Sequence, residues 1–369
     1  MFYVEEIELK DAADLLRRCG LKEPQCVDYT AGVFSVEEAG GLGKGRLAAC
    51  GSLKGEMIQA VAVDSAFQGE DLTGRLLTHL ISAARERGRS NLYLFTKPEK
   101  AYQFQGLGFQ LVATARPYAA LLEWGGGVKA YMKQLAAVRA ETLGHCDDEA
   151  TGAGALVMNC NPFTRGHRHL IEYAAARKKH VFVLAVEEDA SLFSFADRLE
   201  MLKRGTADLS NVTVIPGGRY AVSSLTFPSY FTKEENLAKA HAAMDGEIFA
   251  ACIAPALGTD ERFLGTEPVS AVTAVYNETL KDRLPKRGIK VTEIPRLEAG
   301  GKVISASRVR EILYHIRQEK GTVSGLAGDL GLAELEELLP ESTLSYICRP
   351  ATLQRLDEDF AEREAGANG

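Results

Sequence analysis

Residues 153–178 combine a short apolar segment, a loop and an amphipathic helix, in that order. The segment AGALVM at 153–158 is apolar enough for a buried strand, and apolar residues recur at helical spacing from Leu170 onward. In the loop, Pro162 stiffens the chain and Gly166 lets the backbone approach a ligand closely. The first turn of the helix offers unpaired N–H groups and the positive end of its dipole. The segment therefore predicts a phosphate-binding site at the start of a helix.

The alternation of strands and helices continues downstream. The expected strands are residues 153–158, 180–186, 212–215, 248–254 and 289–294, and the expected helices are 166–178 and 195–205. This order is typical of an α/β fold with a doubly wound, Rossmann-like parallel sheet. In such sheets ligands bind beyond the carboxyl ends of the strands. The loop at 161–166 falls at that edge.

Two short motifs resemble those of the HxGH-type nucleotidyltransferase superfamily. Residues 164–167, TRGH, match its T/HxGH motif, and residues 304–310, ISASRVR, resemble its ISxSxxR element at the start of a second helix. The resemblance implies attack of an oxyanion on the α-phosphate of ATP. That reaction builds charge on phosphate oxygens, so the site needs hydrogen-bond donors rather than a protein nucleophile.

The donors are assigned by their places in the two motifs. His167 is expected to stabilise the α-phosphate, and Thr164 to contact a neighbouring phosphate. Ser305, Ser307 and Arg310 are expected to bind the β- and γ-phosphates. The other residues assigned to ATP binding are Asn161, Pro162, Gly166 and Arg198. Mg²⁺ would enter with the nucleotide, and no metal site of the protein's own is predicted.

Three assignments have plain structural alternatives. Arg198 can instead form a surface salt bridge with Asp197 or Glu200, and His169 can be a solvent-facing helix residue. Residues 258–260 are a weak candidate for an adenosine contact, and an ordinary turn explains them equally well.

The N-terminal half resembles the GNAT acetyltransferase fold. Strand-like segments and a long amphipathic helix follow the order of that fold, and LGF at 107–109 ends the pattern. In GNAT enzymes a Gln/Arg-Gly-x-Gly-x-Gly loop binds the pyrophosphate of acetyl-CoA. Gln68 and Gly69 match it, but Asp71 and Thr73 replace its second and third glycines. Because a carboxylate repels pyrophosphate, we expect either a degenerate domain that holds a CoA-like arm at Gln68 and Gly69, or a purely structural domain.

A chain of 369 residues is long enough for two domains. We place the boundary near residue 145, with the GNAT-like domain at 1–145 and the nucleotidyltransferase domain at 146–350. The tail at 351–369 is charged and then rich in small residues, so we expect it to be disordered. The glycine-rich residues 40–45 lack the GK[ST] ending of a P-loop and predict a hairpin turn.

Composition limits the partners and the compartment. The net charge of -7 gives no electrostatic reason to expect nucleic acid as the main partner. Seven scattered cysteines without a CxxC pair favour neither a zinc site nor a disulfide framework. The N-terminus, MFYVEEIELK, has acids where a signal peptide is basic, and no apolar run approaches the roughly 20 residues of a membrane span. We therefore expect a cytoplasmic protein that does not bind membranes.

The combination of the two halves resembles the citrate lyase ligase family. Four stretches carry the likeness: MNCNPFTRGHRHLIEYA, SLFSFADRLEML, GTEPVSAVTAVYNETLK and VISASRVREIL. The resemblance implies an acid–thiol ligase that activates acetate with ATP as acetyl-AMP and releases pyrophosphate. The acetyl group would then pass to the thiol of a CoA-derived prosthetic group on the acyl-carrier subunit of citrate lyase, with release of AMP.

Two other functions fit the same motifs. An adenylyltransferase of a small phosphorylated metabolite would share His167 and Ser305 but release a dinucleotide-like product. A GNAT acetyltransferase with a regulatory nucleotide-binding domain would use acetyl-CoA and cleave no ATP. The sequence does not rank Arg165, Arg219 and Tyr220 as candidates for the acetate pocket.

Overall fold

The computed structural model describes residues 1–36, 45–144, 152–187, 191–222, 237–267, 270–323 and 330–367. Contacts divide the chain into two compact units, each described by itself below. Unit 1 comprises Met1–Tyr131 and the part of helix α7 up to Glu247, and unit 2 comprises the remainder from Met132. The predicted boundary near residue 145 and residues 40–44 of the predicted hairpin lie outside the described residues, so both stay predictions.

Unit 1 is built on a mixed seven-stranded sheet with the order β1-β2-β3-β4-β5-β7-β6. Only β4 and β5 are parallel; the other neighbours are antiparallel. The strands are β1 (Phe2–Glu6), β2 (Tyr29–Ser35), β3 (Leu47–Lys54), β4 (Met57–Val63), β5 (Leu92–Thr96), β6 (Gln110–Ala115) and β7 (Ala119–Trp124). The helices are α1 (Leu9–Arg18), η1 (Ser65–Phe67), α2 (Leu72–Glu86), η2 (Pro98–Lys100), α3 (Ala101–Gln105) and α4 (Gly127–Leu143), the last of which continues into unit 2.

Helix α2 packs on this sheet through one apolar face. Its buried residues recur at helical spacing and are Leu72, Leu76, Leu77, Leu80, Ala83 and Ala84. They share a core with residues of β2 and β3, among them Ala31, Val33 and Leu53. Full burial of each leucine stabilises the fold by about 1.5–3 kcal/mol. This packing fixes the start of α2 and the loop that joins it to β4.

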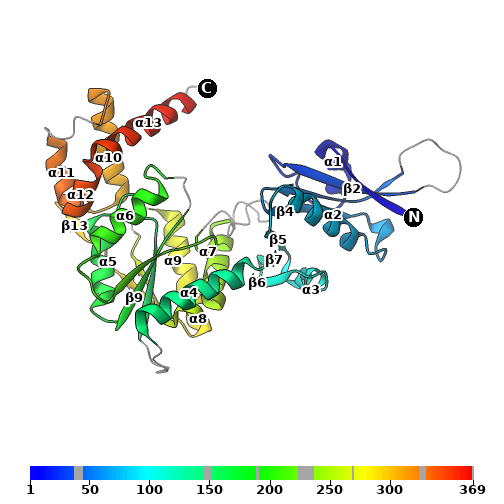
Figure 1. Ribbon diagram of the computed structural model, residues 1–369, viewed down its shortest axis with the longest axis horizontal. Helices are drawn as coiled ribbons and strands as arrows, with labels where there is room; N and C mark the ends of the chain where they lie inside the picture. The colour runs from blue at the N-terminus through cyan, green and yellow to red at the C-terminus, as the bar shows by residue number, and fades with distance from the viewer. Residues whose placement is uncertain are drawn as a thin grey trace. The chain divides into compact units, whose positions relative to one another are not determined.

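Unit 2 contains the predicted parallel sheet, with the order β10-β9-β8-β11-β12. The strands are β8 (Ala153–Met158), β9 (His180–Ala185), β10 (Val212–Pro216), β11 (Thr259–Gly265) and β12 (Lys290–Ile294). Figure 1 shows α5 (Arg165–Ala175) and α6 (Phe195–Gly205) on one side of this sheet and α9 (Ala271–Arg283) on the other. Because both faces are covered, all six residues of β9 are buried. The α/β, doubly wound prediction is confirmed.

One predicted strand of unit 2 is wrong. Residues 248–254 continue from α7 (Leu237–Ile248) into a π-helical turn (Phe249–Ile253) and α8 (Ala254–Leu257). An apolar run of this length fits a buried helix as well as a buried strand. The strand at this place in the sheet is β11. It was not predicted because the charged residues Glu261 and Arg262, which are both buried, interrupt its apolar pattern.

The position of β11 also corrects the suggested adenosine contact at residues 258–260. Gly258 ends α8 in the left-handed conformation, and Thr259 pairs with Ala153 at the first position of β8. Residues 258–260 therefore lie at the amino edge of the sheet, opposite to the loop at 161–166. The turn interpretation is correct for Gly258, whereas residues 259–260 begin β11.

Four further helices complete unit 2, after the short strands β13 (Glu298–Ala299) and β14 (Lys302–Val303). These helices are α10 (Ala306–Lys320), α11 (Leu330–Leu338), α12 (Glu341–Ile347) and α13 (Pro350–Ala367), and a short helix η6 (Pro285–Arg287) precedes β12. The prediction of a disordered tail is wrong for residues 351–367. Leu353, Leu356 and Phe360 form an apolar stripe that is buried in the main core of unit 2, and Arg355 donates to Asp197 of α6 at 2.6 Å. The charged outer face of α13 concealed this stripe.

Candidate functional site

The loop after β8 ends at Thr164, which caps helix α5. The Thr164 hydroxyl accepts a hydrogen bond from the backbone N–H of His167 at 3.3 Å, and the Thr164 backbone N–H donates to the His167 ring at 3.1 Å. Thr164 is 1% exposed, so its hydroxyl is held inside this capping arrangement. The structure thus places Thr164 as the residue that positions His167. Its predicted contact with a phosphate stays a prediction.

Hydrogen bonding sets the tautomer of His167. Its Nδ1 faces the backbone N–H of Thr164, which can only donate, so Nδ1 accepts and the neutral ring carries its proton on Nε2. Burial, together with the charges of Arg296 and Arg310, lowers the pKa of His167 from 6.5 to about 4. At neutral pH, His167 therefore offers an Nε2–H donor without a charge of its own.

Helices α5 and α10 begin next to each other. A Cβ on Gly166 would lie 2.9 Å from the carbonyl oxygen of Ile304, the residue before Ser305, which caps α10. Only glycine allows so close an approach. Arg310, one turn into α10, donates its Nη1 to the carbonyl oxygen of Asn161 at 2.6 Å. The TRGH and ISASRVR motifs therefore meet at one place in the structure.

The first turns of α10 carry the positive charge of Arg310, which forms no ion pair with a carboxylate of the described residues. Arg310 donates to Asn161 and, through Nη2, to the hydroxyl of Ser307 at 3.0 Å; it forms no ion pair with any described residue. Burial lowers the pKa of its guanidinium. Ser305 accepts a hydrogen bond from the Arg308 N–H at 3.2 Å as the helix cap, and Ser307 is exposed. This arrangement suits an anion at the helix start.

Arg198, a predicted phosphate contact, lies in the interior of unit 2. It is fully buried, and its Nη1 donates to the carbonyl oxygens of Asn159 and Val186 at 3.0 and 2.6 Å and to the Asn159 side chain at 2.8 Å. Its Nε donates to the carbonyl oxygen of Phe193 at 3.0 Å. These contacts tie the segments that follow β8 and β9 to α6. The alternative of a surface salt bridge does not describe this buried position, and the predicted phosphate contact of Arg198 stays a prediction.

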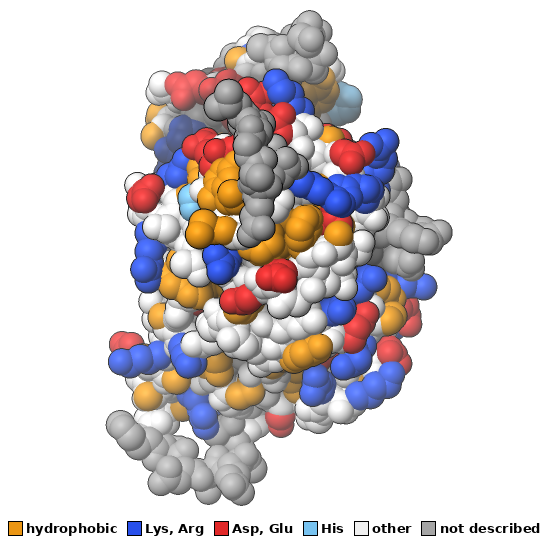
Figure 2. All heavy atoms as spheres, turned by 90° about the vertical axis from the view of Figure 1, so that its right-hand side faces the viewer, with side chains coloured by type: hydrophobic (Ala, Val, Ile, Leu, Met, Phe, Trp, Pro, Cys, Tyr) orange, Lys and Arg blue, Asp and Glu red, His pale blue; other side chains and the backbone are white. Residues whose placement is uncertain are grey.

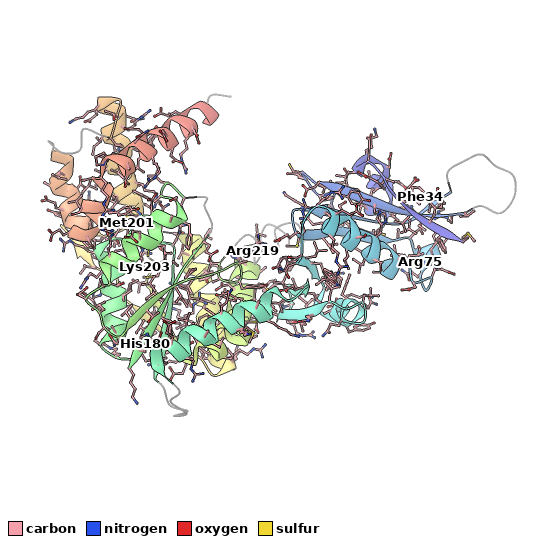
Figure 3. All side chains as sticks on the ribbon, viewed as in Figure 1. Phe34, Arg75, His180, Met201, Lys203 and Arg219 are labelled. Atoms are coloured by element: carbon pink, nitrogen blue, oxygen red, sulfur yellow. The ribbon has the colours of Figure 1, made fainter. Side chains whose placement is uncertain are left out.

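The remaining residues of the loop are also structural in this conformation. Asn161 is 8% exposed, and its side-chain oxygen accepts from the Phe193 N–H at 3.1 Å; Pro162 is buried beside it. His169 is partly buried on α5. His180, labelled in Figure 3, begins β9 at the amino edge of the sheet, where it lies 2.9 Å from the Thr213 hydroxyl. His167 is therefore the histidine that the fold brings to the meeting point of the two motifs.

Sequence reasoning missed Arg296, which follows β12. Its Nε donates to the carbonyl oxygen of Thr266 at 2.6 Å, and its Nη2 pairs with Glu267. Its charge is close enough to His167 to lower that pKa. A signal was available, because a cation two residues beyond the predicted strand 289–294 lies at the ligand-binding edge of a parallel sheet.

In unit 1, Gln68 and Gly69 lie on the loop that joins η1 to α2. Both are exposed, and Gly69 has a φ of +96° that favours glycine. Asp71, at the start of α2, is exposed with a φ of 51°, and its carboxylate oxygen Oδ1 would lie 2.8 Å from a Cβ on Gly74. The Asp71 carboxylate thus lies against the first turn of α2.

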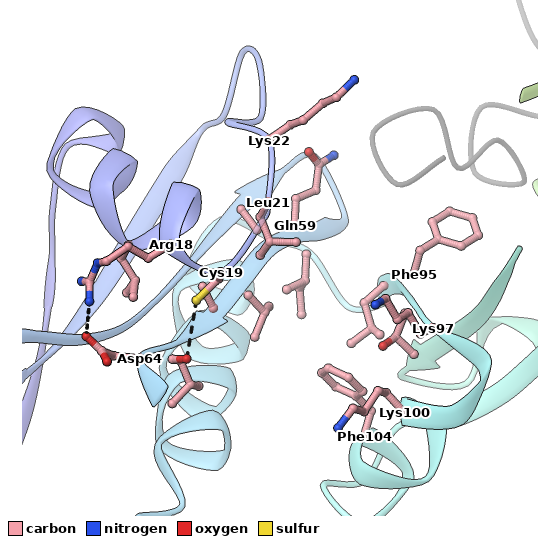
Figure 4. A pocket seen from close by; sticks show the side chains of 18 of the residues that line it. Arg18, Cys19, Leu21, Lys22, Gln59, Asp64, Phe95, Lys97, Lys100 and Phe104 are labelled. Carbon is pink, nitrogen blue, oxygen red and sulfur yellow. Dashed lines mark hydrogen bonds and ion pairs between the residues drawn. The ribbon is translucent and has the colours of Figure 1, made fainter. Parts of the chain in front are cut away.

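A cleft of about 520 Å³ opens in unit 1 beside this loop (Figure 4). It lies where β4 and β5 part, since they pair at only two positions, Met57 with Tyr93 and Ile58 with Leu94. Gln59, which is 7% exposed, and Gln68 line it, as do the exposed side chains of Lys22, Lys97 and Lys100. The cleft therefore combines apolar strand residues with a buried amide and four cations, of which Arg18 is paired with Asp64.

Other classes of site receive no support from the described residues. No group of three or more His, Cys, Asp or Glu side chains there is arranged to hold a metal ion. Over the same residues, none of the helices has both the length and the apolar character to span a membrane. On the face in Figure 2, basic and acidic side chains are interspersed rather than gathered by charge.

Solved structures that resemble the chain cover about a third of it. An IAA acetyltransferase from Bacillus cereus is 16% identical with a TM-score of 0.26, over 34% of this chain and 99% of that one. The ribosomal-protein-S18-alanine N-acetyltransferase from Escherichia coli is 19% identical with a TM-score of 0.27, over 34% of this chain and 93% of that one.

Comparisons of sequence reach most of the chain. The family model "Citrate lyase ligase C-terminal domain" matches residues 153–347. A [citrate [pro-3S]-lyase] ligase from Klebsiella pneumoniae is 39% identical over 83% of this chain and 85% of its own length. One from Haemophilus influenzae is 36% identical over 93% and 96%, and one from Escherichia coli is 36% identical over 83% and 86%. The chain belongs to the citrate lyase ligase family.

Proposed function

We propose that the chain is an ATP-dependent ligase that activates acetate as acetyl-AMP and transfers the acetyl group to citrate lyase. The acceptor is the thiol of the CoA-derived prosthetic group on the acyl-carrier subunit. ATP enters with Mg²⁺, pyrophosphate leaves in the first step, and AMP leaves in the second. The relatives are named as ligases of citrate lyase, which supports the acceptor.

One observation carries the first step: the neutral Nε2–H donor of His167 lies where α5 and α10 begin, beside the positive charge of Arg310. Attack on the α-phosphate adds negative charge to its oxygen atoms, which a fixed donor stabilises without rearrangement. Arg310, Ser307 and the start of α10 would hold the β- and γ-phosphates of the departing pyrophosphate. Thr164, Gly166 and Arg198 would act as positioning residues, because their contacts fix the loop and the two helix starts.

The cleft of unit 1 supports a role in the second step. The apolar strand residues that line the cleft suit the pantetheine part of a CoA-like arm, and its lysines suit the phosphates. Gln68 and Gly69 would lie near these phosphates. The Asp71 carboxylate disfavours the pyrophosphate position of free acetyl-CoA. Unit 1 would accordingly guide the arm of the carrier rather than catalyse acetyl transfer from acetyl-CoA.

Acetate-dependent exchange of radiolabelled pyrophosphate into ATP tests the first step, and reactivation of the thiol form of citrate lyase tests the second. We expect exchange that requires acetate, and AMP release with lyase reactivation only when ATP, acetate and lyase are all present. AMP release or lyase reactivation without acetate contradicts the proposal. Adenylylation of a phosphorylated metabolite supports the adenylyltransferase instead, and lyase acetylation from acetyl-CoA without ATP supports the acetyltransferase.

A further inference from the structure

The carboxyl ends of β8, β11 and β12 lie side by side, because β11 pairs in parallel with both other strands. Each strand leads into polar groups at this edge. The chain after β8 reaches the start of α5, that after β11 reaches Thr266 and Glu267, and that after β12 reaches Arg296. The edge therefore carries more than the phosphate-binding groups of α5 and α10.

Arg296 is fixed along one side of its guanidinium. Nε donates to the carbonyl oxygen of Thr266 at 2.6 Å, the backbone N–H of Arg296 donates to the Thr266 hydroxyl at 3.2 Å, and Nη2 pairs with the buried carboxylate of Glu267. Nη1 makes no hydrogen bond with any described residue, and the side chain is 27% exposed. A preorganised donor thus remains for a ligand.

The segment of Arg296 lies beside the helix starts that carry His167 and Arg310. The carbonyl oxygen of Leu297, next to Arg296, accepts from the Ile304 N–H at 2.9 Å, and the Ile304 carbonyl oxygen lies against Gly166 of α5. The segment that carries Arg296 is therefore tied to both helix starts. The influence of Arg296 on the pKa of His167 agrees with this proximity.

We propose that Arg296 binds the carboxylate of acetate beside the α-phosphate of ATP. This assignment rests on the proposed function and identifies the acetate site within it. Nη1 donates to the carboxylate oxygen that does not attack. The other oxygen attacks the α-phosphorus and forms the acetyl–phosphate bond, while the bond to the bridging oxygen breaks and pyrophosphate leaves with its electron pair; no proton is transferred.

Glu267 gives the assignment a distinctive signature. It orients Arg296, but its negative charge also repels a bound acetate. The Glu267→Gln variant keeps a neutral acceptor for Nη2 and removes that repulsion, so acetate binding improves. If the ion pair of Arg296 and Glu267 only stabilises the fold, substitution of either residue should weaken acetate binding.

The Michaelis constants for acetate and ATP in pyrophosphate exchange test the assignment. For Arg296→Ala, we expect the KM for acetate to rise about 10- to 100-fold, the loss typical of a charged hydrogen bond, while the KM for ATP changes by less than about twofold. Arg296→Lys keeps the charge without the planar fork and falls between wild type and Arg296→Ala. Glu267→Gln lowers the KM for acetate several-fold. An unchanged KM for acetate in Arg296→Ala, or equal rises for acetate and ATP in both variants, overturns the assignment.

Saturation-transfer NMR on the acetate methyl group gives a readout that needs no turnover. We expect transfer with the wild-type protein and its loss in Arg296→Ala, with circular dichroism unchanged between the two. Absence of transfer with the wild type, or equal transfer with the variant, contradicts the acetate site. Absence of acetate-dependent exchange while NMR shows Arg296-dependent binding instead contradicts the proposed ligase function and leaves the acetate site standing.

Discussion

Units 1 and 2 each contain a strand that leads through a loop into a helix, yet the two helix starts present different charges. In unit 2 the start of α5 is capped by the neutral hydroxyl of Thr164, and Arg310, which forms no ion pair with a described residue, brings a positive charge beside it. In unit 1 the start of α2 carries the carboxylate of Asp71 against its first turn. A helix dipole attracts anions in both places, but in unit 1 the chain supplies the negative charge itself.

The comparison shows that local geometry alone does not make a phosphate site. Both loops follow a strand of the central sheet, and glycine occurs at Gly69 and Gly166, where another residue would be strained or too large. What distinguishes them is the sign of the side chains around the helix start. We therefore expect the charges to decide which helix start binds a phosphate group, and substitutions at each helix start test this explanation.

Replacement of His167 has the largest expected effect. His167→Ala removes the Nε2–H donor but keeps the backbone N–H that Thr164 caps, so the helix start survives. We expect acetate-dependent pyrophosphate exchange to fall by about 10²- to 10³-fold, as for loss of one preorganised donor. His169→Ala, two residues along the same helix, is the matched control and should retain nearly full exchange. Near-normal exchange in folded His167→Ala contradicts the assigned role.

A methyl group on Gly166 tests the contact between α5 and α10. In Gly166→Ala the new Cβ meets the Ile304 carbonyl oxygen at 2.9 Å, so the two helix starts must move apart. A displacement of this kind costs about 10²-fold in rate. The control is Gly126→Ala, where a Cβ meets nothing within 4 Å. Exchange kinetics identical to wild type in Gly166→Ala would show that the meeting of the two motifs has no role in catalysis.

The sequence predicted the center of unit 2 because its signals are local. The strand 153–158, the capped start of α5 and the start of α10 each depend on residues a few positions apart. The structure brings the two motifs together, with Gly166 against Ile304 and Arg310 bonded to Asn161. The full burial of Arg198 could not be predicted, because burial is a property of the tertiary fold. Its carbonyl partners come from segments after β8 and β9 that no local pattern connects to it.

The missed elements also have physical causes. Strand β11 contains Glu261, whose charge is neutralised by Lys178 and Lys290 from other segments, so a buried strand looked polar. Helix α13 was hidden because its apolar stripe is sparse, and its docking depends on the distant Asp197. Arg296 carries no motif of its own. Its place near His167 follows from the strand order of the sheet, and that order cannot be derived from the sequence unless β11 is correctly placed.

The two loops should also lose stability in different pH windows. The pKa of His167 in the folded state is lowered to about 4, so between about pH 6.5 and pH 4 the unfolded chain binds a proton that the folded chain does not, and stability falls as the pH falls. In unit 1, the Ala66 N–H and the guanidinium groups of Arg18 and Arg46 hold the pKa of Asp64 below its usual value, so its contribution is lost only in more acidic solution. The free energy of unfolding in urea, measured across this range, should lose its dependence on pH between about pH 6.5 and pH 4 in His167→Gln and keep it in Asp64→Asn. A dependence that persists in both assigns the loss to other groups.

The same lowered pKa predicts the pH dependence of the first step. Because His167 stays neutral, pyrophosphate exchange at saturating ATP and acetate should be nearly level between about pH 5.5 and pH 7.5, where an ordinary histidine titrates. A fall in rate centred on about pH 6.5 that is absent from His167→Gln would show that the histidine takes up a proton in the working site.

Removal of the negative charge at the start of α2 has the smallest expected effect. It tests directly whether this charge distinguishes the start of α2 from that of α5. Asp71→Asn keeps the size of the side chain, so the loop geometry and the cleft are retained while the repulsion of phosphate is lost. One unit charge near an exposed site is worth on the order of 1 kcal/mol, which corresponds to roughly a fivefold gain in affinity for CoA by calorimetry. Glu70→Gln, the exposed neighbour, is the matched control, and acetate-dependent exchange in unit 2 should be unaffected by either variant. If Asp71→Asn binds CoA no better than wild type, or if Glu70→Gln gains as much, the carboxylate at this helix start is not what separates the two units, and the cleft must discriminate through its shape.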